Sequence, residues 1–235
     1  SDQLPHFGVE HHESSEDRAR ESYFMDFTSN LTDATLVPHE FIHSWNGKYR
    51  RPDGLNTRNF EEPMRGDLLW VYEGLTQYLG WVLAARSELV TADLNRQFLA
   101  LAAANLDNRA GREWRSLADT AISAQRLYEA RRDWESMRRG VDFYDEGLLI
   151  WLEVDTTIRK QSQGNKSLDD FCHIFFGAPD SPSQVKPYTF DNLTEALSNI
   201  AAYDWKAFFE TRLNRIGTDR APLGGAVGWP GRRLS

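Results

Sequence analysis

The pattern of apolar positions along the chain predicts a mostly helical protein. Between residues 67 and 83, apolar side chains recur with a period of about 3.6 residues, which places them on one face of a helix. Residues 145–161 form a strongly apolar stretch, which predicts a central, buried helix. Further helices are predicted over residues 35–45, 93–108, 116–128 and 167–176, and two more begin at Thr189 and Asp204.

Residues typical of helix starts and of loops support these boundaries. Asp67 can cap the helix that follows it, and Ser167 with Asp170 three residues later has the pattern of a capping box. Residues 51–64 contain two prolines and a glycine, so this segment is predicted to be a loop.

The two ends of the chain lack helical periodicity. The first thirty or so residues are polar and irregular, with room for one or two strands. Residues 221–235 are rich in glycine and proline and are predicted to form an exit segment rather than part of the helical domain. The predicted fold class is therefore mainly α, in one domain, with a small irregular or β-containing N-terminal part.

Composition and charge argue against two classes of partner. The 235 residues carry a formal net charge of −8 and a sequence pI near 5.3, whereas nucleic acid and anionic membrane surfaces require a basic face. The densest basic stretch, residues 126–139, is interleaved with acids and is interpreted as a solvated helix face. No apolar run reaches the roughly 18 residues of a membrane helix, so membrane insertion is not expected.

The single cysteine does not decide between cellular compartments. Cys172 is the single cysteine, so the chain can form no internal disulfide. It lies in an apolar helical context, which is typical of a buried and inert thiol. Cytoplasmic and periplasmic locations both agree with this usage, and the sequence, which starts without a methionine, shows no signal peptide from which to choose.

The segment His39-Glu40-Phe41-Ile42-His43 has the spacing of a zinc site on a helix. Histidines four residues apart lie on one face about one turn apart, so both imidazoles can bind the same tetrahedral zinc ion. Glu40, beside the first histidine, can then accept a proton from the water that attacks a carbonyl group. The pattern occurs by chance in about one chain in a hundred of this length, so a third ligand is needed to support it.

Glu73 is the predicted third ligand. It is the only acid in the otherwise apolar stretch 68–83, and a carboxylate buried there is costly unless it is paired or bound to a metal. Two histidines and a glutamate with an open fourth position are the donor set of hydrolytic zinc sites. The alternative is a buried ion pair between Glu73 and an arginine. The favoured prediction is one zinc ion per chain, held by His39, His43 and Glu73.

These motifs resemble those of the glycyl aminopeptidase family of the gluzincin metallopeptidases. The resemblance rests first on His-Glu-Phe-Ile-His-Ser-Trp-Asn at residues 39–46 and on Trp-Val-Tyr-Glu-Gly-Leu-Thr-Gln-Tyr at residues 70–78. Residues 8–11 (Gly-Val-Glu-His) resemble a Gly-Gly-Leu-Glu-His element of the family, with Phe7 in place of the first glycine.

The resemblance extends over most of the chain. Residues 144–148 resemble the family's Tyr-x-Lys-Gly segment, with Glu146 in place of the common lysine, and residues 167–170 resemble the short acidic helix that follows it. The resemblance implies a mostly helical, thermolysin-like catalytic domain over residues 1–220. It also implies a native protein with an N-terminal β-rich domain and a C-terminal PDZ-like domain, toward which residues 221–235 would lead.

Two further residues receive roles from the resemblance. Tyr144 would donate a hydrogen bond to the oxyanion that develops during hydrolysis, whereas its sequence context alone favours a core residue. Glu10 would bind the free amino group of the substrate, and the alternative is a loop glutamate in a charged patch.

Residues near the predicted zinc helix can orient its ligands. Trp45 and Asn46 directly follow the predicted zinc helix and can shape its end. Ligand imidazoles usually hydrogen-bond to a carboxylate or a carbonyl through their second nitrogen, and Asp33 and Thr76 are candidate partners.

The leading functional hypothesis is a zinc-dependent aminopeptidase that hydrolyses peptides after a small N-terminal residue, glycine or alanine. The family resemblance supplies this specificity. A zinc endopeptidase on the same scaffold is the first alternative, and it would not need Glu10. A non-catalytic peptide-binding module is the second, although such a module would be expected to lack Glu40 or one of the three ligands.

Overall fold

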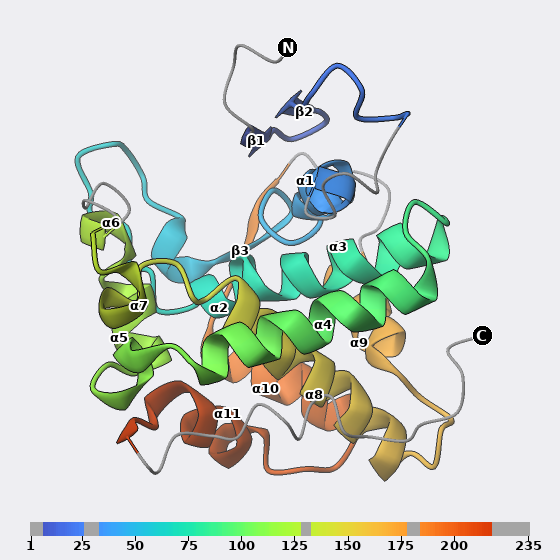
Figure 1. Ribbon diagram of the computed structural model, residues 1–235. Helices are drawn as coiled ribbons and strands as arrows, with labels where there is room; N and C mark the ends of the chain where they lie inside the picture. The colour runs from blue at the N-terminus through green and yellow to red at the C-terminus, as the bar shows by residue number, and fades with distance from the viewer. Residues whose placement is uncertain (1–6, 26–32, 128–132, 178–183, 218–235) are drawn as a thin grey trace.

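The computed structural model describes residues 7–25, 33–127, 133–177 and 184–217, and it is mainly helical, as the sequence predicts (Figure 1). The predicted exit segment 221–235 lies outside the described residues. The helices are α1 (Leu36–His43), α2 (Leu69–Tyr72), α3 (Gly74–Arg86), α4 (Ala92–Asp107), α5 (Leu117–Ile122), α6 (Ala124–Leu127), α7 (Glu135–Arg138), α8 (Asp145–Gln161), α9 (Leu168–Phe176), α10 (Phe190–Ile200) and α11 (Trp205–Asn214). Three short 3-10 helices span Asp33–Thr35, Asp53–Leu55 and Ala110–Glu113.

The described strands form two small sheets. In the N-terminal part, β1 (Phe7–Glu10) pairs antiparallel with β2 (Ser15–Arg18), which agrees with the strands expected there. Farther along, β3 (Arg50–Pro52) pairs in parallel with β4 (Lys186–Tyr188). The second sheet is not predicted, because three-residue strands are too short to show an alternating pattern. The sheet of β3 and β4 joins the segment after α1 to the segment before α10.

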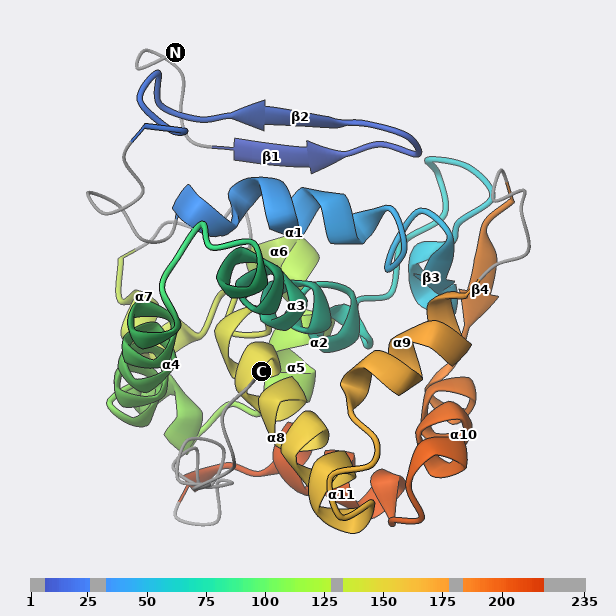
Figure 2. The ribbon, with the colours of Figure 1, turned by 90° about the vertical axis from the view of Figure 1, so that its right-hand side faces the viewer.

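The elements lie in layers that place α1 between the hairpin and the helical body. In two perpendicular views, the hairpin of β1 and β2 covers one side of α1, and α3 lies on its other side (Figure 1, Figure 2). Helix α8 packs against α3 from the interior, and α10 and α11 lie at the far end of the molecule (Figure 2). The segment with the histidine motif is therefore held from both sides.

Aromatic side chains fill the centre of the core around α8. Trp151 of α8 is fully buried, and its ring stacks on that of Trp70 with 6.0 Å between centroids. Its indole nitrogen donates a hydrogen bond to the Trp70 carbonyl at 3.1 Å, so its one polar atom is satisfied. Phe209 of α11 packs on Trp70 at 4.7 Å. The predicted central, buried helix is confirmed, and within the described ranges no helix is long and apolar enough to span a bilayer.

The helix predicted over residues 67–83 is interrupted. It is built as α2 and α3, which meet at Glu73, directly before Gly74, the residue type with low helix propensity. The predicted cap at Asp67 is wrong, because α2 has Leu68 at its N-cap position and no side-chain cap bond.

Other predicted helix starts are confirmed by side-chain hydrogen bonds. Ser167 and Asp170 form the predicted capping box at the start of α9. Thr189 and Asp204 each accept a hydrogen bond from a backbone N–H at the starts of α10 and α11.

A buried network of charges surrounds the start of α8 and explains the glutamate at position 146. The Glu146 carboxylate, which is 4% exposed, forms ion pairs with Arg139 and with Arg112, the latter at 3.4 Å. Arg139 also donates to Asp142 at 2.7 Å, and Asp142 pairs with Arg109. Because a buried charge requires such partners, the network fixes the chain on both sides of Tyr144.

Helices α3 and α8 cross where two glycines face each other. A methyl group added at Gly147 would lie 2.8 Å from the Cα atom of Gly74 and 3.1 Å from the Trp70 carbonyl oxygen. Only glycine lets the two backbones approach this closely. The crossing sets the distance between Glu73, which precedes Gly74, and Tyr144, which begins α8.

We expect Gly147→Ala to lower the free energy of unfolding by about 1–3 kcal/mol, because the added methyl overpacks a backbone contact that cannot yield. Gly140→Ala is the matched control, since an added methyl there meets no atom within 4 Å. Its effect should stay within about 0.5 kcal/mol. Denaturant unfolding followed by tryptophan fluorescence measures both values, and equal stability of the two variants would contradict this account of the crossing.

Candidate metal centre

Three side chains from two helical segments meet beneath the β1–β2 hairpin. His39 and His43 lie one turn apart on α1, and Glu73 lies at the junction of α2 and α3. The Nε2 atoms of the two histidines are 3.0 Å apart, and each lies 3.3 Å from Oε2 of Glu73. The structure thus brings together the three residues that the sequence predicts as ligands.

The geometry of this cluster fits a metal better than a set of hydrogen bonds. Oε2 of Glu73 is buried and has no hydrogen-bond partner among the described residues, although two imidazole nitrogens lie within 3.3 Å. All three atoms face one another, and a single cation between them would satisfy them together. Two imidazole nitrogens and a carboxylate oxygen are a donor set that zinc takes in open, three-ligand sites.

Electrostatics also favour a cation at this position. Burial raises the pKa of Glu73, but His43 and His39 outweigh burial and lower it to about 2. Burial lowers the pKa of His43, but the charge and close approach of Glu73, the charge of Glu10 and the hydrogen bond with the Asn46 backbone together outweigh burial and raise it to about 9. The site therefore holds a positive charge on His43 when no metal is bound, and a metal ion would take the place of that proton.

The alternative interpretation of Glu73 as an arginine ion pair is wrong. Within the part of the chain that the structure describes, its ion pairs are formed with His39 and His43 alone. The carboxylate is buried with these two imidazoles as its neighbours, which is the arrangement that a metal ligand requires.

The second nitrogen of His43 has a defined partner that the sequence did not identify. Nδ1 of His43 lies 3.0 Å from the backbone carbonyl oxygen of Asn46, so it carries the proton and leaves Nε2 free to bind a metal. The two candidates named from the sequence have other partners, since Asp33 pairs with Arg20 and Thr76 bonds to Asn46. Such a backbone partner has no sequence signal.

The corresponding nitrogen of His39 differs. Nδ1 of His39 is buried without a hydrogen-bond partner in the described ranges. Its ring is oriented by packing, against His43 on one side and Tyr144 on another. Trp45 is exposed, and its ring packs on that of Phe41, which is exposed as well.

Glu40 lies on α1 beside the cluster and under strand β1. A methyl group added at Gly8 would lie 2.6 Å from Cδ of Glu40, so the strand backbone rests directly on this side chain. Burial raises the pKa of Glu40 to about 7, against an opposing effect of His43 and with support from the charges of Glu10 and Glu73. A carboxyl group with a pKa near neutrality is suited to accept and return a proton.

Tyrosine rings flank both imidazoles. Tyr144, at the N-cap position of α8, stacks on His39 with 6.0 Å between ring centroids and also packs against the hydrophobic core. Tyr72 lies 4.8 Å from His43, and its hydroxyl donates a hydrogen bond to Glu10. The predicted Tyr144 is thus near the cluster, whereas Tyr72 was missed, although it directly precedes Glu73.

Glu10 lies on β1 and faces the cluster rather than an open loop. It accepts the Tyr72 hydroxyl, and its Oε1 lies 3.4 Å from Nζ of Lys48. Burial raises the pKa of Glu10, but His43, Tyr72 and Lys48 outweigh burial and lower it. Glu10 is therefore an ionised carboxylate close to His43. Lys48 is the second residue that sequence reasoning missed here.

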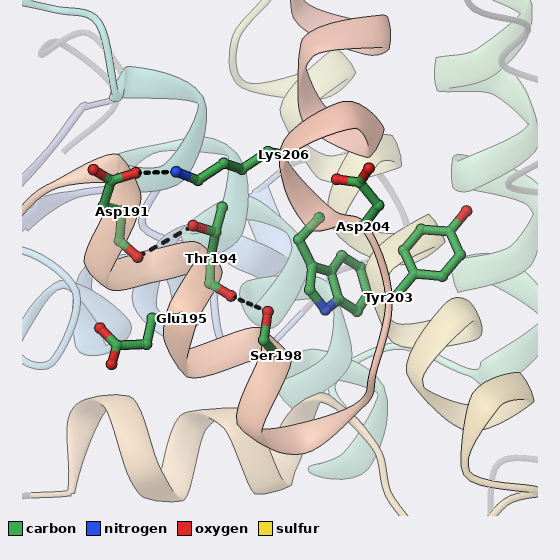
Figure 3. A pocket seen from close by; sticks show the side chains of 8 residues that line it. Asp191, Thr194, Glu195, Ser198, Tyr203, Asp204 and Lys206 are labelled. Atoms are coloured by element: carbon green, nitrogen blue, oxygen red, sulfur yellow. Dashed lines mark hydrogen bonds and ion pairs between the residues drawn. The ribbon is translucent and has the colours of Figure 1, made fainter.

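A shallow pocket elsewhere lacks the features of a reaction centre (Figure 3). It lies between α10 and α11, at the end of the molecule away from α1 (Figure 2). Asp191 pairs with Lys206 at 2.6 Å, Thr194 donates to the Asp191 carbonyl, and Ser198 donates to the Thr194 carbonyl. These polar groups serve the two helices themselves, so the pocket supports no functional assignment.

Comparison with known proteins agrees with the mainly helical fold. The chain is similar in structure to an aminopeptidase N family protein from Idiomarina loihiensis, with a TM-score of 0.59 and 22% sequence identity. The similarity covers 88% of this chain but only 38% of that protein, so the chain spans well under half of its length. No curated protein sequence matches the chain.

The family comparison covers the cluster itself. Residues 32–150, about half of the chain, match the model of the M61 glycyl aminopeptidase family. The match includes His39, His43, Glu73 and Tyr144, whereas Glu10 precedes it. The chain therefore belongs to the M61 glycyl aminopeptidase family.

Proposed function

We propose that this protein is a zinc-dependent aminopeptidase that hydrolyses peptides after a small N-terminal residue, glycine or alanine. The observation that carries the proposal is the meeting of two imidazole nitrogens and an orphaned, buried carboxylate oxygen within 3.3 Å. Membership of the M61 glycyl aminopeptidase family supports peptide hydrolysis and the choice of substrate. The fold would be thermolysin-like, and the site that of a gluzincin.

In this proposal His39, His43 and Glu73 hold one zinc ion per chain. When bound, zinc supplies a Lewis acid that activates water and polarises the substrate carbonyl. Glu40 takes a proton from the attacking water and returns it to the amine that leaves, which its position on α1 beside His39 supports. Tyr144 donates a hydrogen bond to the carbonyl oxygen as that oxygen becomes negative.

Glu10 would bind the ammonium group at the N-terminus of the substrate. Its lowered pKa supports an ionised carboxylate, and the electrostatic effect of His43 on Glu10 supports a place beside the cluster. Lys48 holds the same carboxylate at 3.4 Å, so a substrate ammonium would share Glu10 with Lys48 or displace it. Pairing with a charged carboxylate in a half-buried setting gives such a site its preference for free amines.

Two alternatives use the same residues differently. A zinc endopeptidase would keep the metal ligands and Glu40 but would not need Glu10. A non-catalytic peptide-binding module would need neither Glu40 nor the zinc. We further propose that residues 1–220 form the catalytic domain and that the whole protein adds an N-terminal β-rich domain and, after residues 221–235, a C-terminal PDZ-like domain.

The protein should bind one zinc ion per chain, and His39→Ala should abolish this binding because two ligands are too few for a tight site. Metal analysis after dialysis against a weak chelator measures the stoichiometry. His173→Ala, which changes an exposed histidine of α9, is the control and should retain full zinc. Stoichiometric zinc in a Glu73→Ala variant would contradict the third ligand.

Glu40→Gln should keep zinc bound but lower kcat by about 10²–10⁴-fold, because an amide cannot accept the proton of the attacking water. Hydrolysis of glycyl peptides by zinc-loaded wild type and variant gives the comparison. If the loaded variant turned over near the wild-type rate, Glu40 would not be the general base. If wild type bound zinc and cleaved no peptide, the binding-module alternative would be favoured.

The enzyme should cleave glycyl peptides with a free amine and reject their N-acetyl counterparts by about 10²-fold or more, because an acetylated amine has no charge to pair with Glu10 and the loss of a close charge pair costs about 2–5 kcal/mol. Glu10→Gln should remove most of this preference and keep the zinc. Glu16→Gln, on the neighbouring strand β2 and exposed, is the matched control and should behave as wild type. Equal cleavage of free and acetylated peptides by wild type would favour the endopeptidase.

A further inference from the structure

We propose that Asn46 is a positioning residue that holds the His43 ring and the Glu73 carboxylate in the relative position that metal binding requires. This inference rests on the proposed zinc site, but it concerns a residue that touches neither metal nor substrate. Asn46 is completely buried in the turn after α1, between that helix and the junction of α2 and α3. It makes hydrogen bonds to both ligand-bearing segments.

The side chain of Asn46 holds the segment that carries Glu73. Its Nδ2 donates toward the carbonyl oxygens of Val71 at 2.9 Å and Tyr72 at 3.2 Å, and toward Oγ1 of Thr76 at 3.1 Å. The last carbonyls of a helix lack intrahelical partners, so this amide acts as a cap for α2. The acceptors lie on both sides of Glu73, which is where the predicted single helix is interrupted.

The backbone of the same residue holds His43. The Asn46 carbonyl oxygen accepts the proton on Nδ1 of His43 at 3.0 Å, which fixes the tautomer and the direction of the ring. The Asn46 N–H donates to the carbonyl of Ile42 at 2.9 Å, so the turn is tied back to α1. One residue therefore fixes the imidazole through its backbone and the carboxylate-bearing junction through its side chain.

A third anchor ties Asn46 to a distant part of the chain. Its Oδ1 accepts the hydroxyl of Tyr188, at the end of β4, at 3.2 Å. All polar atoms of Asn46 thus have hydrogen-bond partners. The side chain must both donate and accept hydrogen bonds here, and an amide does both. An aspartate would place negative charge against the carbonyl oxygens of Val71 and Tyr72, and an apolar residue would remove the side-chain donor that Asn46 offers to the Val71 carbonyl oxygen.

The relative placement of the metal ligands depends on Asn46, because His39 has no hydrogen bond of this kind in the described part of the chain. Nδ1 of His39 makes no hydrogen bond in the described part of the chain, and packing alone orients its ring. Of the two imidazoles, His43 is the one whose direction is set by a hydrogen bond, and Asn46 provides that bond. Loss of the amide should let the turn and the junction of α2 and α3 move apart.

Zinc affinity separates positioning from general stability. We expect Asn46→Ala to bind zinc about 10–100-fold more weakly than wild type, the usual cost of removing a group that orients metal ligands. Competition with a chromophoric chelator measures the dissociation constant of the folded protein. The visible absorption of the cobalt-loaded protein reports the ligand geometry and should change in the variant. Denaturant unfolding of the metal-free protein gives the stability in parallel.

A pair of threonine variants provides the matched control. Thr76 and Thr120 are both completely buried, and each donates its hydroxyl to a carbonyl four residues earlier, but only Thr76 also accepts from Asn46. Thr76→Val should weaken zinc binding and alter the cobalt spectrum, while Thr120→Val should lower stability alone. If Asn46→Ala does not fold, this pair decides the question.

The outcomes separate this inference from the proposed function. If wild type binds no zinc, the proposed function fails. If wild type binds zinc while Asn46→Ala and Thr76→Val bind it with unchanged affinity and unchanged cobalt spectra, Asn46 is merely structural and this inference alone is overturned. Weaker zinc binding in Asn46→Ala and Thr76→Val, with wild-type affinity in Thr120→Val, supports it.

Discussion

A carboxylate buried within a hydrophobic protein must have a positive partner, and Glu73 meets this requirement with two imidazoles rather than with an arginine. The cost of burying this charge explains much of the surrounding structure. Helices α2 and α3 are separated at Glu73, and Asn46 bonds to the carbonyls on one side of it. Without a metal, the charge is balanced by a proton on His43. The site is therefore arranged for a cation.

Close approaches of the backbone give this cluster its form. Gly8 allows β1 to rest on Glu40, and the contact between Gly74 and Gly147 brings the start of α8 to the junction that carries Glu73. The charges around Glu146 then fix the chain beside Tyr144 from the opposite side. Glu40, Glu73 and Tyr144 come from three separate segments, and small residues let those segments meet.

The sequence predicted the parts of the fold that depend on local pattern. The histidine spacing on α1, the apolar run of α8 and the capping box at the start of α9 are local signals, and the structure contains the corresponding elements. An acid alone among apolar residues identified Glu73. Contacts made through backbone atoms or between distant segments had no such signal. The carbonyl of Asn46, the pairing of Lys48 with Glu10 and the strands β3 and β4 belong to this second class.

The central claim is that His39, His43 and Glu73 hold zinc. Crystals grown with zinc, with diffraction data collected on both sides of the zinc absorption edge, test it most directly. The account predicts one anomalous peak per chain, about 2.0–2.2 Å from Nε2 of each histidine and from the Glu73 carboxylate. A zinc peak coordinated by other residues, or one that the Glu73 carboxylate does not contact, would contradict it.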